Sequence, residues 1–349
     1  MRLEPKPAPS LAVTLLYPVG AIAVTVVIAS LLVLAAGANP FAVFGLVLKG
    51  AAGSQFALME TLTRATPLIF TGLAVAVAFR AKLWNIGAEA QLYAGAILTV
   101  VLGTGALPLP APILLPLIAV FAGLAGAMLL LGPAVLKVRF GVDEVVTTLL
   151  LNFVMILFVS MLLEGVLKDP TGLGWPQSQK LIAEARLPRI VTGRRLHYGF
   201  VLALISAIAV WIVMKKTTLG YEMRAVGHNP EAARFAGMPV NRILLKTALI
   251  SGGLAALGGF SEVAGLKGNL TLDLSPGFGY SGIVVAMLAM LNPLGVIVAA
   301  IFVAGIFVGA DAMSRTADVP SYIANVMVAT ALLTMVTAIM LTRFRVKWR

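Results

Sequence analysis

Residues 215–246 have the sequence KKTTLGYEMRAVGHNPEAARFAGMPVNRILLK, a polar stretch inside a chain that is otherwise mostly apolar. This stretch contains six Lys/Arg residues and two acids. Loops that remain on the cytoplasmic side of a membrane protein carry an excess of Lys and Arg. Residues 215–246 are therefore predicted to form a cytoplasmic loop, with a membrane-spanning helix on either side.

The cytoplasmic loop is predicted to contain a short helix over about residues 230–236. Asn229 is a favoured N-cap residue, Pro230 suits the first helical turn and Glu231 is a first-turn acid. Gly237 is a stop signal for the helix. The side chains between these signals are mainly small, which lets the backbone of another protein approach closely. A cytoplasmic protein is therefore predicted to dock here.

The composition identifies an integral membrane protein. The chain has 349 residues, of which 60% are hydrophobic and 11% charged, and its mean hydropathy is +1.00. Soluble domains have roughly 25% charged residues. The apolar runs are much longer than membrane strands need, which favours helices over a β-barrel. The net charge of +12 arises from basic residues in loops beside apolar spans, so it indicates orientation and not nucleic-acid binding.

The residue types that are missing exclude several kinds of chemistry. The chain has no cysteine, and its two histidines are far apart in sequence. Disulfides, thiol catalysis and cysteine-ligated metals are therefore excluded, and a histidine-based metal cluster is not predicted.

The fold class predicted from the apolar runs is all-α, a polytopic transmembrane bundle of about ten helices. Eight helices are the alternative if the short segments only re-enter the membrane. Residues 41–52 are amphipathic and too short to cross, so they are predicted to lie at the outer surface or to re-enter the membrane in part. The predicted spans are residues 11–36, 61–79, 90–136 divided in two at 103–116, 145–163, 196–214, 247–263, 274–310 divided at Asn292-Pro293, and 319–342.

Both termini are predicted to be cytoplasmic. Basic residues precede the first span, which is too long for a signal peptide, and a basic tail from Arg343 to Arg349 follows the last span. Residues 1–349 are predicted to form a single transmembrane domain. An external loop at about 168–195 carries six Lys/Arg and two acids, contrary to the usual charge bias.

Two segments interrupt the apolar runs with Asn and Gly, WNIGAEAQ at residues 84–91 and MLNPLG at residues 290–295. Paired interruptions in the two halves of a membrane protein point to a transport path. Asn85, Gln91 and Asn292 are therefore candidates for lining that path. The alternative is that both segments are ordinary loop turns.

Three ionisable or polar residues lie in or beside the spans. Glu89 and Glu144 are either functional groups at membrane depth or first-turn acids that complement a helix dipole. Asn152, with the neighbouring Thr147 and Thr148, places polar atoms inside a span. It either bonds to neighbouring helices or lines a path.

Glycine pairs in two spans predict close helix packing, a structural role. They are Gly123 and Gly126 in the fourth span, and Gly252-Gly253 and Gly258-Gly259 in the seventh.

The sequence has no G-x-x-x-x-G-K-[ST] motif, so the chain is not predicted to hydrolyse a nucleotide. It also lacks the series of intramembrane acids or histidines that a proton-coupled carrier needs. Energy for uphill transport would have to come from a partner, through the cytoplasmic loop. A stand-alone secondary carrier or channel is the competing class.

Five motifs, in this order, resemble the permease subunits of bacterial ABC importers for nucleosides. These importers depend on a BMP-type lipoprotein and belong to a wider group with the ribose and branched-chain amino acid permeases. The similarity extends from about Glu60 to the C-terminus. The motifs are PLIFTGL at 67–73, FRAKLWNIGAEAQ at 79–91, DEVVTTL at 143–149, GYEMRAVGHNPEAA at 220–233 and GYSGIVVAML at 279–288.

The resemblance implies an inner-membrane permease that forms half of a translocation path for nucleosides, or alternatively for a simple sugar or a branched-chain amino acid. It implies no cofactor in this chain, because ATP is bound by cytoplasmic ATPase subunits. The other partners would be a second related permease chain, an external solute-binding protein and membrane lipid, without nucleic acid. The residues that match the family's ATPase-coupling segment are Gly220, Tyr221, Arg224, Ala225, Gly227, Asn229, Pro230, Glu231, Ala232, Ala233 and Gly237.

Overall fold

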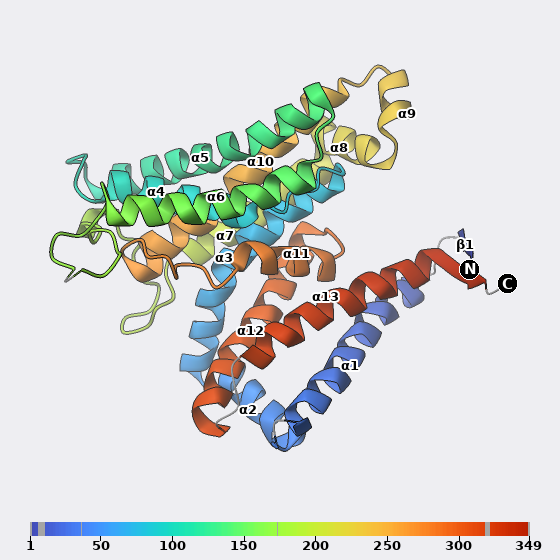
Figure 1. The fold of residues 1–349 in the computed structure, drawn as a ribbon, viewed down its shortest axis with the longest axis horizontal. Coiled ribbons are helices and arrows are strands. Elements are labelled where there is room, and N and C mark those ends of the chain that lie inside the picture. Colours follow the sequence, from blue (N-terminus) through green and yellow to red (C-terminus); the bar gives the residue numbers. More distant parts are fainter. Residues whose placement is uncertain (1, 6–10, 36, 173, 318–321, 348–349) are drawn as a thin grey trace. The chain divides into compact units, whose positions relative to one another are not determined.

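The computed structural model in Figure 1 describes residues 2–5, 11–35, 37–172, 174–317 and 322–347. Over these residues it contains thirteen α-helices and one pair of short strands, β1 (Arg2–Pro5) and β2 (Phe344–Lys347). The helices are α1 (Leu11–Ala35), α2 (Pro40–Ala52), α3 (Gln55–Arg80), α4 (Ala88–Gly103), α5 (Ala111–Phe140), α6 (Glu144–Glu164), α7 (Gly199–Lys216), α8 (Thr218–His228), α9 (Pro230–Phe235), α10 (Val240–Ser261), α11 (Phe278–Leu288), α12 (Pro293–Ala317) and α13 (Tyr322–Arg343).

The predicted helical membrane architecture is confirmed, since every predicted span contains a helix. Among the described residues, six helices are long and apolar enough to cross a membrane. A seventh span results if residues 23–35 and 40–52, which are bent by 114°, are counted as one. Helices α4 and α11 are apolar but shorter. The count of ten crossings therefore stays a prediction. Residues 318–321, at the start of the last predicted span, and residues 348–349, in the basic tail, lie outside the described ranges.

The chain divides into two compact units, residues 1–61 with 301–349, and residues 62–300. In the first unit α1 and α13 lie side by side (Figure 1), with the Thr25 and Thr334 hydroxyls 3.1 Å apart. Strand β1 pairs antiparallel with β2, and Arg2 is opposite Lys347. The prediction of a single domain stays a prediction.

The core of the second unit is built around α10, which packs against α5 and α4 (Figure 1). A Cβ atom on Gly126 or on Gly252 would collide with the main-chain oxygen of the other residue. The two backbones are therefore in direct contact, which confirms the predicted close packing. Gly123 is looser, because a Cβ there would lie 3.8 Å from the Gly253 oxygen.

The segment predicted as an external loop is described over residues 168–172 and 174–195, and main-chain hydrogen bonds join it to the residues that follow α10. A π-helix (Glu262–Lys267) extends α10, and Leu187 N donates to Ala264 O at 2.8 Å. Ser178 N donates to Leu270 O at 2.9 Å. This segment therefore forms a cap on one end of the second unit.

Candidate functional site

The loop between α3 and α4 turns back into the helix bundle. The Asn85 side chain is fully buried, and its Nδ2 donates to Ser251 Oγ on α10 at 3.0 Å. Ser251 Oγ donates in turn to Ala74 O on α3 at 2.7 Å. Ala74 precedes the end of α3 by six residues, about 9 Å along the helix. The chain therefore leaves α3 and re-enters beside it, so that α4 begins inside the bundle.

Asn85 and Gln91 close this re-entrant loop. Asn85 Nδ2 donates to Gln91 Oε1 at 2.9 Å, and Gln91 Nε2 donates to Asn85 Oδ1 at 2.8 Å. Asn85 Oδ1 also accepts from Gly87 N at 3.0 Å. Burial of an amide is costly unless it is hydrogen-bonded. The reciprocal pair meets that requirement and fixes the backbone just before α4.

A polar stripe on α6 holds the same loop from the other side. Glu144, Thr148 and Asn152 are spaced four residues apart, so they share one face of the helix. All three are buried, and Glu144 also forms an ion pair with Lys137. The bonds to the loop are Trp84 N to Glu144 Oε1 (3.1 Å), Ile86 N to Thr148 Oγ1 (3.2 Å), Ala90 N to Asn152 Oδ1 (3.0 Å) and Asn152 Nδ2 to Ile86 O (3.0 Å).

Glu89 joins the start of α4 to the start of α11. Its carboxylate accepts a hydrogen bond from Gly279 N at 2.6 Å, in the first turn of α11. A Cβ on Gly279 would collide with the Glu89 backbone. Asn152 Nδ2 also donates to the Tyr280 hydroxyl at 3.1 Å. Glu89 is thus both a first-turn acid of its own helix and a cap for a second one.

We call the residues Asn85, Glu89, Gln91, Asn152 and Gly279 the α4–α11 junction. The irregular segment that leads into α11 runs along α4. Tyr93 Oη donates to Leu272 O at 2.7 Å. Ser275 Oγ accepts from Phe278 N at 2.9 Å. Irregular backbone at membrane depth is tolerated only where it is buried in protein or lines a watery cavity.

Asn292 belongs to a different turn. Met290 and Leu291 have positive φ angles of 51° and 58°. The exposed Asn292 then caps α12 by accepting from Leu294 N at 3.1 Å. The two interruptions in the apolar runs are therefore built differently, and the structure brings only the first into the junction.

Sequence reasoning identified four of the five junction residues but not their partners. The sequence also indicated Thr148 as a polar residue of the span, but the stripe that it forms with Glu144 and Asn152, at a spacing of four residues, was not recognised. Ser251 and Tyr280 meet the junction from positions more than 120 residues away along the chain, and no local pattern indicates this.

In the predicted cytoplasmic loop, α8 is a helix that sequence analysis missed. Its buried face consists of Gly220, Met223, Val226 and Gly227. A Cβ on Gly227 would collide with the oxygen of Arg80, the last residue of α3. Arg224 Nη1 donates to Met214 O on α7. Helix α8 is therefore held directly against the ends of α3 and α7.

The short helix α9 confirms the predicted caps. Asn229 Oδ1 accepts from Glu231 N at 3.0 Å and from Ala232 N at 3.1 Å. Gly237, just beyond the helix, has a φ angle of 81°. One detail differs from the expected small docking face. Ala233 is only 4% exposed and faces its own chain, whereas Phe235 is 96% exposed.

A comparison with protein families identifies the chain. The family described as "Branched-chain amino acid transport system / permease component" matches residues 57–341, a range that contains the junction and helices α8 and α9. The chain belongs to this permease family. It is therefore a multi-pass membrane permease subunit of an ABC importer and not its ATPase.

Individual relatives cover almost the whole permease. It is 36% identical to the glucose ABC transporter permease TsgB13 of Haloferax volcanii, over 94% of this chain and 89% of that protein. It is 35% identical to the guanosine ABC transporter permease NupP of Bacillus subtilis, over 91% and 92%. It is 31% identical to the nucleoside ABC transporter permease NupB of Lactococcus lactis, over 90% and 88%.

Among solved structures, PsaBC from Streptococcus pneumoniae in complex with Fab matches 84% of this permease and 95% of that chain. The sequence identity is 15% and the TM-score is 0.43.

Proposed function

We propose that this permease forms half of the translocation path of an ATP-driven nucleoside importer. The observation that carries the proposal is the similarity to the guanosine permease and the nucleoside permease, each over at least 88% of both chains. The similarity to a glucose permease, at 36% identity, makes a simple sugar the second candidate.

On this proposal the translocation path runs at the α4–α11 junction. Two short helices begin within the bundle and meet at Glu89, and short helices that start at membrane depth are a feature of transport sites. The junction side chains are bonded to one another in this structure. On this proposal Asn85, Glu89, Gln91 and Asn152 line the path, or hold its wall, as it opens, and Asn292 acts at the neighbouring turn.

Helices α8 and α9 support a coupling role. Helix α9 projects Glu231, Ala232 and Phe235 outward, while α8 contacts the ends of α3 and α7. An ATPase that binds α9 would therefore pull or push directly on two long helices. The ATP itself would be bound by that partner, and on this proposal the permease holds no cofactor of its own.

The proposed assembly contains two related permease chains, two ATPase domains and an external binding protein in a bacterial inner membrane. Both termini and α9 are placed in the cytoplasm, and the ordered segment 168–195 faces the binding protein. The ten helices of the predicted bundle are then α1, α3, α4, α5, α6, α7 and α10–α13. Eight crossings remain if α4 and α11 only re-enter.

Reconstitution tests the proposal. Proteoliposomes with the complete importer should take up radiolabelled guanosine when ATP is enclosed with the ATPase and the binding protein is added outside. Glucose should not compete with this uptake. Uptake by the permease alone under an ion gradient would contradict the ABC mechanism, and uptake of glucose without guanosine would select the second candidate.

A further inference from the structure

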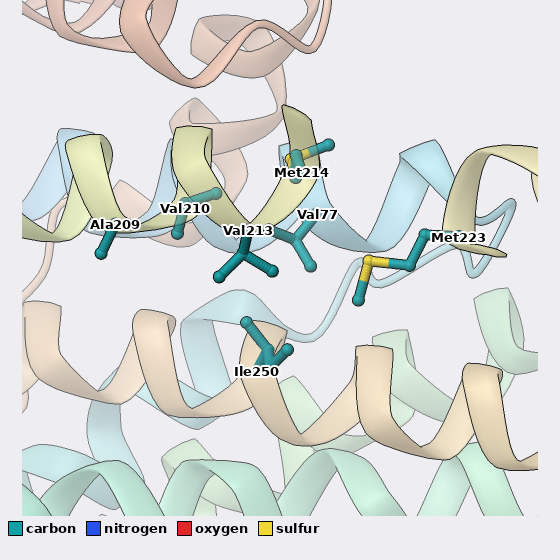
Figure 2. A pocket seen from close by; sticks show the side chains of 7 residues that line it. All are labelled: Val77, Ala209, Val210, Val213, Met214, Met223 and Ile250. Carbon is teal, nitrogen blue, oxygen red and sulfur yellow. The ribbon is translucent and has the colours of Figure 1, made fainter. Parts of the chain in front are cut away.

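A cavity of about 200 Å³ lies between α3, α7, α8 and α10, and none of the α4–α11 junction residues lines it. Figure 2 shows its seven lining side chains, all apolar, with Met223 of α8 at one end and Ile250 of α10 opposite α7. Ala209 is exposed, and Val213 and Ile250 are half-buried. The cavity therefore opens on the side of the unit, where a membrane helix meets lipid or another protein. We call it the α7–α10 cavity.

Each helix that lines the cavity carries basic residues near one common end of the cavity. This is the end at which α3 and α7 finish and α10 begins. On each of these helices a lining residue has a Lys or Arg within about one helical turn, and we call these five Lys/Arg residues the rim. The pairs are Val77 with Arg80 on α3, Met214 with Lys215 and Lys216 on α7, Met223 with Arg224 on α8, and Ile250 with Lys246 on α10.

Arg80 and Arg224 are two of these cations that lie close together. The guanidinium groups of Arg80 and Arg224 repel each other, and α8 is pinned there by the contact of Gly227 with Arg80 O. Arg80 Nε is buried without a hydrogen-bond partner in the described part of the chain. Glu222 is the acid that α8 contributes nearby. A rim of five cations and one acid favours a bound anion.

The rim also has the features of a membrane interface. Lys215 Nζ lies 5.5 Å from the centroid of the Trp211 ring. Trp and Lys side chains at the end of a membrane helix gather at the level of the lipid headgroups. The apolar cavity lies deeper in the membrane than the cationic rim, which is at the level of the headgroups. In a phospholipid the acyl chain likewise lies deeper than the phosphate.

We propose that the α7–α10 cavity and its rim bind an anionic phospholipid. One acyl chain lies against Ala209, Val213 and Ile250, and the phosphate group contacts Lys216 and Lys246. A polar solute would bind poorly because the walls of the cavity are apolar. A free anion would contact only the cationic rim and would leave the apolar cavity unfilled. The bound lipid touches Met223, so it steadies α8 against α7 and α10. The site thus connects membrane composition to the helix that carries α9. This proposal does not depend on the transported substrate.

Lipid exchange on the purified importer tests the headgroup. The sample is equilibrated with equal amounts of dioleoyl phosphatidylglycerol and dioleoyl phosphatidylcholine, washed, and its retained lipids are counted by mass spectrometry. Each cation removed should lower the retained ratio of phosphatidylglycerol to phosphatidylcholine about fivefold, which corresponds to about 1 kcal/mol. The double variant Lys216→Gln and Lys246→Gln should therefore lose about twenty-fivefold. Arg139→Gln, an exposed cation in the last turn of α5, is the matched control and should change nothing.

A second pair of variants tests the acyl chain. Ala209→Phe fills the open side of the cavity and should release the lipid. Ile212→Phe, at an exposed position on α7 outside the cavity, should leave binding unchanged. A variant that merely misfolds would lose both phospholipids, so the ratio separates misfolding from loss of the site.

Three results would overturn the proposal. Equal retention of the two phospholipids would show that the rim does not select an anion. Displacement of phosphatidylglycerol by the same concentration of inorganic phosphate would show an anion site without an acyl chain. The third uses the absence of native cysteines. An Ala209→Cys variant labelled with a fluorophore should be quenched by doxyl phospholipids in the assembled importer, and protection from quenching would show that a second permease covers the cavity.

Discussion

At the scale of the residue, polar side chains inside the spans bond mainly to the main chain of a neighbouring segment. Asn152 is the clearest case, since it donates to Ile86 O and to the Tyr280 hydroxyl and accepts from Ala90 N. Asn85 does the same for Gly87 N within its own loop. These side chains replace the partners that a helix would otherwise supply, which is why the chain can be irregular at this depth.

Asn152→Leu should lower the stability of the permease. The change leaves Ala90 N and Ile86 O unpaired, at a cost of about 1–3 kcal/mol each. A thermal-shift measurement in detergent should show a lower melting temperature, together with reduced uptake. Thr147→Val is the control, because Thr147 Oγ1 bonds only to oxygens of its own helix turn, in Asp143 and Glu144. Equal melting temperatures for both variants would contradict the bonding role of Asn152.

His197 predicts a pH dependence of stability. Its ring is buried, Nδ1 accepts from Gly199 N at 3.1 Å, and burial lowers the pKa of the imidazole to about 4. The unfolded pKa is near 6.5, so the contribution of His197 is complete above pH 6.5 and falls as the pH drops towards 4. The full loss is about 3 kcal/mol.

The measurement is the melting temperature between pH 7.5 and pH 4.5. His197→Asn keeps a side-chain acceptor for Gly199 N but does not titrate, so its melting temperature should fall less over this range. An identical fall in both proteins would show that other groups control the acid sensitivity.

At the scale of the element, α8 and α9 are consecutive helices that differ in exposure. Helix α8 presents glycines to the ends of α3 and α7, so it cannot move without them. Helix α9 is capped at Asn229, and it presents a large aromatic side chain outward. The docking of a partner on the small residues of α9 stays a prediction, and the sequence did not reveal that Ala233 is buried and Phe235 exposed.

Ala232→Trp and Phe235→Ala should uncouple transport from ATP hydrolysis while the permease remains folded, because both positions are exposed on α9. Ala233→Trp should instead destabilise the segment, because its side chain is 4% exposed and a ring would overpack it. Pull-down of the ATPase and melting temperature, measured on the same samples, distinguish the two effects. Normal ATPase binding by both exposed variants would contradict the docking role of α9.

Gly279→Ala should disrupt the α4–α11 junction. A methyl group there collides with the Glu89 backbone, and overpacking typically costs about 1–3 kcal/mol. In Gly123→Ala the new methyl has room, lying 3.8 Å from the Gly253 oxygen. That control should be neutral or gain up to about 1 kcal/mol, because alanine favours a helix interior. Thermal stability of the two variants, side by side, checks this prediction.

At the scale of the whole molecule, orientation rests on the distribution of charge. The excess of Lys and Arg in loop 215–246 and in the basic tail predicts that both are cytoplasmic, whereas segment 168–195, predicted to be external, also carries an excess of cations. The ordered structure of that segment, bonded to residues 264–270, shows that it is a folded cap. Five of its six Lys/Arg residues are nevertheless exposed.

The cysteine-free chain permits a direct test of orientation. Thr192→Cys in the external cap should react with a membrane-impermeant maleimide added to intact cells. Ala232→Cys on α9 should react only after the membrane is permeabilised. Both positions are exposed, so access to the reagent is decided by the membrane. The reverse pattern of labelling would invert the proposed topology.

Five sequence motifs indicated the permease family. Hydropathy, charge and capping determined the helical membrane class, a helix within each predicted span and the caps of α9. These patterns depend on a window of about 20 residues, where side-chain chemistry acts locally. Sequence also indicated Asn85, Glu89, Gln91 and Asn152 as unusual polar residues. It could not say which were partners, and it missed α8, whose many polar residues resemble those of a loop.

Only the tertiary structure decided how the pieces meet. It joined Asn85 to Ser251 and Glu89 to Gly279, across 166 and 190 residues of chain, and it separated Asn292 from them. It turned Ala233 inward and Phe235 outward, and it gathered four helices around the α7–α10 cavity. The physical reason is that close packing and burial depend on which helices touch. No residue's own neighbours in the sequence carry that information.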